Sequence, residues 1–358
     1  MSALTRSLTV VVLTVVLVGG FAPAASAHSV NSGPQPSNYR SVLTSVTPVT
    51  DGIRIQLLDN GLHVQVTVTA RHVVTVLGYS GEPYLQVDGS GAAVNTNAPD
   101  YYLNRNANLG SVPSSLASNA APHWHTLGSA PQVIWHDHRT HFMGYTPPPA
   151  VAAAPDHAHP VANWALHLVV DGHPVIANGT LTWIPGPSPA LPLTAAILGA
   201  AAITAGIAAT RRRWWLALTM VATTSWAVEL TRAAALVGGR SGPVTTRLGA
   251  LAGHGALLLA LTVTFGVLIR GALRRRLWAA GLAAFFGVIT LLSLDLPGLS
   301  VLWRSQMLTS VSPPAFRALT ATALASSLAV SIGGALQLRR LEPLPSRQPT
   351  TARVEEPV

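Results

Sequence analysis

The residues best suited to chemistry in this sequence lie between His123 and Met143, in the run HWHTLGSAPQVIWHDHRTHFM. These 21 residues hold five histidines, two tryptophans, one aspartate and one arginine. Imidazole nitrogens are good ligands for zinc, copper, nickel and iron, and a nearby carboxylate can orient a ligand ring. The run is therefore a candidate transition-metal site, for copper first and zinc second.

The spacing of these histidines indicates how they would meet. Side chains two residues apart in an extended chain share a face. The histidines form two such pairs with a fifth just beyond them: His123 with His125, His136 with His138, and His141. If the two pairs lie on neighbouring strands, three or four ring nitrogens converge, with Asp137 on the opposite face.

A structural role explains the same residues without any metal. Arg139 is close enough in sequence to pair with Asp137 or with a backbone carbonyl, and the tryptophans would then anchor the core. In that case the cluster holds a loop rigid. The residues alone leave both explanations open.

A second candidate site begins at the N-terminus. Residues 1–27 have the features of a secretory signal peptide: Arg6, an apolar run, and small residues up to Ala27. Cleavage after Ala27 would leave His28 as the first residue, and its amine and ring nitrogen can hold one copper ion together. An uncleaved anchor helix is the alternative.

The turn Asp171-Gly172-His173-Pro174 resembles the DGHP turn of CopC-type copper-resistance domains. That resemblance implies that His28, Asp171 and His173 form one Cu(II) site. It covers the N-terminus and residues 164–183 only.

A broader resemblance is to uncharacterised actinobacterial exported membrane proteins. It is carried by five segments: LGYSGEPYLQ (77–86), PDYYLN (99–104), WHDHRTHFM (135–143), VDGHPV (170–175) and GTLTWIP (179–185). The resemblance implies a shared fold and export, and it implies no particular activity.

The composition places part of the chain in a membrane. The sequence is 49% hydrophobic and 10% charged, whereas about 25% charged residues is usual for soluble domains. It contains no cysteine, which excludes disulfides, thiolate metal sites and cysteine nucleophiles. Because it also lacks a nucleophile elbow, a phosphate loop, a dinucleotide fingerprint and a zinc-protease motif, an enzyme is not expected.

Arginine placement predicts the topology of the membrane part. Five apolar spans are long enough to cross a hydrocarbon core of about 30 Å, and they cover 190–210, 214–237, 248–269, 277–296 and 316–338. Arginines cluster after the first, third and fifth spans, which puts those ends in the cytoplasm. Residues 28–188 then lie outside the membrane. We therefore expect a multi-pass protein of the cell membrane.

The charge balance indicates which kinds of partner the protein is expected to bind. The net charge of the whole chain is +9, but residues 28–188 carry five arginines against eight acids, a balance of −3. The positive charge therefore belongs to the membrane part, and nucleic acid is not an expected partner. The lipid bilayer is expected, and a second envelope protein is a candidate partner.

The exported part has the pattern of a β domain. Residues 53–58, 62–77 and 164–183 alternate apolar with polar side chains, and Asp59-Asn60-Gly61 is a hairpin signal. The predicted fold class is therefore mixed. An exported all-β, antiparallel, sandwich-like domain over 28–188 precedes an α-helical membrane domain of five spans over 189–338. A cytoplasmic tail over 339–358, expected to be disordered, follows.

Two charged residues fall inside the second apolar span. Glu229 and Arg232 are three apart, so they share a helix face and are expected to pair. Asp295 is expected at the membrane edge.

Overall fold

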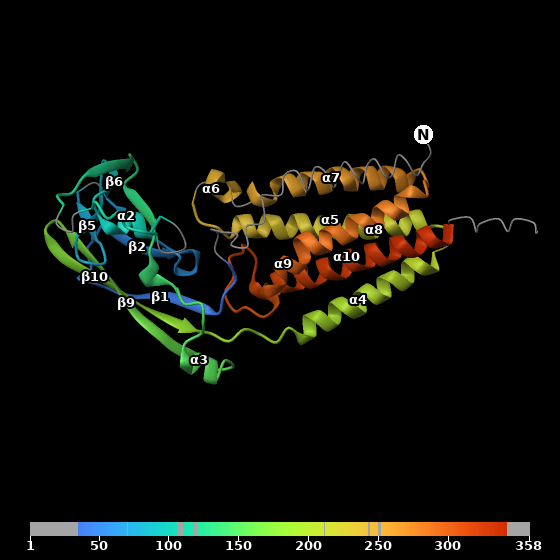
Figure 1. The fold of residues 1–358 in the computed structure, drawn as a ribbon, viewed down its shortest axis with the longest axis horizontal. Helices are drawn as coiled ribbons and strands as arrows, with labels where there is room; N and C mark the ends of the chain where they lie inside the picture. Colours follow the sequence, from blue (N-terminus) through green and yellow to red (C-terminus); the bar gives the residue numbers. More distant parts are fainter. Residues whose placement is uncertain are drawn as a thin grey trace, which may run out of the picture.

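A computed structural model describes residues 35–341 except 70, 106–109, 117–119, 211, 243 and 250–251. A β domain comes first, and a long bundle of helices follows it, with an extended link between them (Figure 1). The predicted signal peptide, His28 and all of the predicted tail beyond Leu341 lie outside the described residues.

The β domain is built from two antiparallel sheets. The larger has seven strands in the order β1 (Tyr39–Thr47), β10 (His173–Trp183), β9 (His159–Val170), β4 (Val74–Leu77), β5 (Pro83–Asp88), β6 (Gly91–Asn95) and β7 (Trp124–Gly128). The smaller has three, in the order β2 (Ile53–Leu58), β3 (His63–Val68) and β8 (Gln132–His136). Two short helices, α2 (Pro99–Leu103) and α3 (Pro149–Ala153), lie in loops of the β domain. The predicted antiparallel β domain is confirmed.

One hydrophobic core joins the two sheets. In β3 every second side chain is buried, and β10 alternates in the same way. The buried face of the small sheet includes Val64, Val66 and Trp135, and it belongs to one cluster with Val76 and Leu168 of the large sheet. Each fully buried side chain of this size contributes roughly 1.5–3 kcal/mol. This burial fixes the register of the strands that lead to the candidate site.

The β2–β3 hairpin turns through the 3₁₀ segment η1 (Asp59–Gly61), as the sequence predicts. Its residues adopt positive φ angles of 53°, 59° and 90°, which Asp, Asn and Gly tolerate better than other residues. A Cβ on Gly61 would lie 2.6 Å from the carbonyl oxygen of Thr140. The Thr140 hydroxyl donates to the Gly61 carbonyl oxygen at 2.6 Å. The turn is thereby fastened to the segment that follows β8.

Among the described residues, four helical segments are long and apolar enough to span a membrane: Ala190–Ala209, Gly255–Leu273, Trp278–Leu302 and Pro313–Arg340. They correspond to α4 (Ala190–Ala209), α7 (Ala252–Leu273), α8 (Trp278–Thr290) with its continuation, and α10 (Pro313–Leu341). The continuation of α8 comprises η3 (Leu291–Asp295), α9 (Leu296–Gly298) and η4 (Leu299–Leu302). The sequence predicts five spans, and the second of them, 214–237, corresponds to α5 (Trp214–Gly238), which is not among these four. That helix packs against α7, α8 and α10, and the short α6 (Val244–Gly249) follows it.

A buried ionic cluster lies inside the bundle. Arg232 Nη1 is 3.0 Å from Glu229 Oε1, which confirms the predicted pair, and 2.9 Å from Asp295 Oδ1. Asp295 is fully buried, whereas the sequence places it at the membrane edge. The π-helical turn η3 carries Asp295, and such turns insert an extra residue that redirects side chains.

The β domain rests on the bundle through specific hydrogen bonds. Ser37 and Gln306 exchange backbone hydrogen bonds of 2.9 and 2.8 Å. Ser305 donates its backbone N–H to the Asn38 side chain and its hydroxyl to the Ile184 carbonyl oxygen, both at 2.8 Å. The loop before α10 therefore holds both the entry to β1 and the exit from β10.

Candidate metal centre

The candidate site forms where β8 ends and the 3₁₀ turn η2 (His138–Thr140) begins. Asp137, at the junction, keeps an extended backbone conformation and caps η2 by accepting from the Arg139 backbone N–H at 3.0 Å. The capped turn ends the strand at once. It brings side chains on both sides of Asp137 to the same end of the small sheet.

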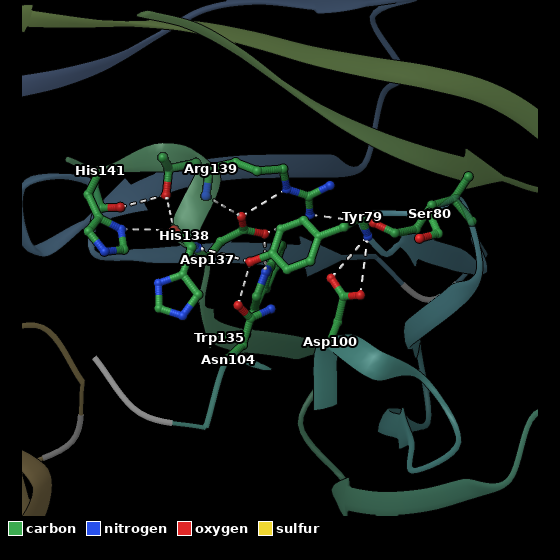
Figure 2. A network of polar contacts seen from close by, with 12 residues as sticks. Tyr79, Ser80, Asp100, Asn104, Trp135, Asp137, His138, Arg139 and His141 are labelled. Atoms are coloured by element: carbon green, nitrogen blue, oxygen red, sulfur yellow. Dashed lines mark hydrogen bonds and ion pairs between the residues drawn. The ribbon is translucent and has the colours of Figure 1, made fainter. Parts of the chain in front are cut away.

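Asp137 is the centre of a buried hydrogen-bond network (Figure 2). Its Oδ2 accepts from Arg139 Nη2 at 2.7 Å and from the Trp135 indole N–H at 2.9 Å, and its Oδ1 accepts from Arg139 Nε at 2.9 Å. Burial alone would raise the pKa of Asp137, but the donors from Arg139 and Trp135 hold it below its usual value. The carboxylate is thus ionised and fully used by these donors.

Residues from distant loops complete this framework. The Arg139 guanidinium lies over the Tyr79 ring, 4.7 Å from its centroid. The Tyr79 hydroxyl donates to Asn104 Oδ1 at 2.6 Å and accepts from the His138 backbone N–H at 3.2 Å (Figure 2). The backbone that carries His138 is therefore fixed from a second side.

Three histidines converge beside this network. His136, His138 and His141 each offer one ring nitrogen, and these atoms all lie within 4.8 Å of one another. The Nε2 atoms of His136 and His141 are 3.3 Å apart. Two nitrogens that lie 2.0–2.1 Å from one tetrahedral ion are separated by about 3.3–3.4 Å. The spacing of the His136 and His141 nitrogens therefore suits a shared metal ion.

Hydrogen bonds leave the correct nitrogen of His141 free. Its Nδ1 is 2.9 Å from the Asp137 carbonyl oxygen, which can only accept, so Nδ1 carries the proton in the neutral ring. Nε2 then presents a lone pair toward His136. A backbone carbonyl that fixes the ring tautomer in this way is common at protein metal sites.

The electrostatic surroundings keep the rings of His136 and His141 neutral. Burial, together with the neighbouring imidazoles, lowers the pKa of His136 to about 3. Burial likewise lowers the pKa of His141 to about 4, against the opposing effect of its hydrogen bond to Asp137. Neutral imidazole is the form that coordinates metals, so no proton has to leave these two rings at neutral pH.

His123 and His125 do not join this group. β7, which holds His125, pairs with β6 in the large sheet, whereas β8 pairs with β3 in the small one. The prediction that the two histidine pairs lie on neighbouring strands is wrong, because the short link after Gly128 carries the chain from one sheet to the other. Both histidines are exposed, and His123 Nδ1 contacts the Thr96 hydroxyl at 2.8 Å.

The second candidate site is described only in part. Asp171 lies in the β9–β10 turn, where Oδ2 is 2.6 Å from His72 Nδ1 and Oδ1 accepts from the Val73 N–H at 2.9 Å. His173 is exposed. Since His28 lies outside the described residues, its predicted grouping with these two stays a prediction.

A further histidine, not expected from the sequence, borders the cluster. His63 lies directly opposite His136 in the β3–β8 pairing, and their ring centroids are 5.9 Å apart. Its Nδ1 is 2.8 Å from Asp59 Oδ2, while Asp59 Oδ1 accepts from the Ser241 backbone N–H at 3.3 Å. This chain of contacts links the edge of the candidate site to the helical domain.

Asp100 makes stability of the β domain depend on pH. Its carboxylate accepts from the Tyr79 N–H at 3.1 and 3.2 Å, yet burial, reinforced by the Glu82 carboxyl group, raises its pKa to about 7. The folded protein therefore holds a proton on Asp100 that the unfolded chain releases near pH 4. Stability should fall by about 3 kcal/mol as pH rises from 4 to 7.

Unfolding of the full-length protein at pH 4.5 and 7.5 measures this dependence. Asp100→Asn should flatten it, and Asp156→Asn, at an exposed position, should leave it unchanged. An equal pH dependence in Asp100→Asn and in the unaltered protein would contradict the assignment.

Comparison with known proteins gives no match to this chain: no family model, no curated protein and no solved structure is similar to it.

Proposed function

We propose that this chain is a cell-envelope membrane protein whose exported β domain binds a transition metal, copper or zinc, through His136, His138 and His141. The observation that supports this most directly is the convergence of three ring nitrogens within 4.8 Å. Imidazole suits both metals. The neutral state of His136 and His141 adds a chemical reason, because neither ring must lose a proton to bind.

The helical domain, in this proposal, anchors the metal-binding domain to the membrane with five spans. Four helices are long and apolar enough, and α5, which packs among them, is the fifth. An odd number of spans puts the β domain and the residues after α10 on opposite sides of the membrane. The arginine distribution then puts the β domain outside and the residues after α10 inside. A reporter fused after Val358 should be cytoplasmic and one fused at Ser188 exported; the reverse result would refute this topology.

A structural or partner-docking role without metal is the competing function. The Asp137–Arg139 network favours it, because such a network is sufficient to hold the end of β8 rigid. The two readings share this framework and differ only in the rings. Metal binding requires that His136, His138 and His141 act together, whereas a purely structural network does not need their lone pairs.

A metal titration separates the two functions. Full-length protein in detergent should bind one equivalent of zinc or copper at neutral pH. His136→Ala and His141→Ala should each reduce the affinity by about 100-fold, the upper end of the loss seen when only a supporting residue is removed. His157→Ala, on an exposed loop, is the control. If the unaltered protein takes up neither metal at micromolar concentration, the structural function stands.

A further inference from the structure

A methionine sulfur lies against the histidine cluster. Met143 follows His141 by two residues, and its Sδ is 3.0 Å from His138 Nδ1. The other ring nitrogen of His138, Nε2, is 3.0 Å from the Leu103 carbonyl oxygen. His138 is buried, so both of its ring nitrogens have defined protein neighbours.

The proton of His138 cannot serve both contacts in the neutral ring. A carbonyl oxygen only accepts, so Nε2 must carry the proton and donate to Leu103. Nδ1 then has a lone pair, and a thioether sulfur has no proton to give. In the neutral ring, two lone pairs therefore face each other at 3.0 Å. A cation between or beside Nδ1 and Sδ would turn this unfavourable contact into a favourable one.

The geometry needs only a small adjustment to place one ion against both atoms. A nitrogen about 2.0 Å and a sulfur about 2.3 Å from a tetrahedral ion are about 3.5 Å apart. The Met143 sulfur would have to withdraw by about 0.5 Å. The unbranched methionine side chain has three rotatable bonds and accommodates such shifts easily.

The ligand set distinguishes between the two metals. Thioether is a soft ligand that selects Cu(I), whereas zinc sites use cysteine, histidine and carboxylate. The Asp137 carboxylate, in the same turn, is occupied by Arg139 and Trp135. We propose that Met143 Sδ is the fourth ligand, beside His136, His138 and His141, and that the site is selective for Cu(I). This inference rests on the proposed metal-binding function.

Met143→Leu tests the sulfur ligand, because it keeps the apolar volume and removes the thioether. Full-length protein is titrated anaerobically with Cu(I) against a competing chelator, and separately with Zn(II). The variant should lose at least about tenfold in Cu(I) affinity and keep its Zn(II) affinity within about threefold. Met220→Leu, at an exposed position of α5, is the matched control and should change neither affinity.

X-ray absorption at the copper edge gives a second readout that folding defects do not imitate. The unaltered protein should show a sulfur neighbour at about 2.3 Å, and Met143→Leu should show none. Equal Cu(I) affinity in both proteins, without a sulfur neighbour, overturns this inference but leaves metal binding by the histidines intact. Loss of Cu(I) selectivity in His63→Ala but not in Met143→Leu would assign the fourth ligand to His63 instead. Absence of any metal uptake by the unaltered protein overturns both proposals.

Discussion

Asp137→Ala should destabilise the β domain by about 3–5 kcal/mol, the cost of breaking a buried ion pair by removing one partner. The substitution leaves the guanidinium of Arg139, whose side chain is only 18% exposed, without its carboxylate. It also leaves the Trp135 indole N–H without an acceptor and removes the cap of η2. Because that cap positions His138 and His141, metal affinity should fall by about 10–100-fold as well.

Hydrogen exchange in the full-length protein measures this effect where it should occur, at the backbone amides of β3 and β8. Asp156→Ala is the control, because its side chain is 78% exposed, and it should change stability by less than about 0.5 kcal/mol. Unchanged protection of β3 and β8 in Asp137→Ala would show that the network does not stabilise the domain.

The second large effect is expected inside the helical bundle. Arg232→Met leaves Glu229 and Asp295 buried without the cation that both contact. We expect a loss of about 3–5 kcal/mol, because uncompensated charge away from water is costly. The loss should appear as earlier unfolding of the helices in a denaturant titration of the detergent-solubilised protein.

A compensating variant separates charge from packing in this cluster. Combining Arg232→Met with Glu229→Gln and Asp295→Asn removes all three charges and should recover much of the stability. Arg212→Met, at an exposed position before α5, should have little effect. If the neutral triple variant is as unstable as Arg232→Met alone, packing rather than charge explains the loss.

The strands of the β domain could be predicted because their signals are local. Alternation in β3 and β10 follows directly from one buried and one exposed face, and the Asp59-Asn60-Gly61 turn needs residues that accept positive φ. The pairing of strands could not be predicted in the same way. Nothing between Gly128 and Gln132 signals that the chain changes sheets. The prediction that β7 and β8 are neighbouring strands is therefore wrong.

The candidate site was predictable to the extent that it is local. His136, His138 and His141 lie within six residues, so one strand end and one turn bring them together. Tyr79 and Asn104 reach the site from distant loops, and no spacing in the sequence connects them to it. The burial of Asp295 was missed for a different reason. Asp295 lies next to the end of the predicted apolar span, which suggests a position at the membrane edge. The π-helical turn instead directs its side chain into the bundle.

The most direct test of the proposed metal centre is to locate the metal by anomalous X-ray diffraction from crystals of the full-length protein grown with copper or zinc. A single strong peak should lie between the ring nitrogens of His136, His138 and His141, about 2.0–2.1 Å from each coordinating atom. A peak at Asp171 and His173 instead, or no peak near the three rings at full metal loading, would contradict it.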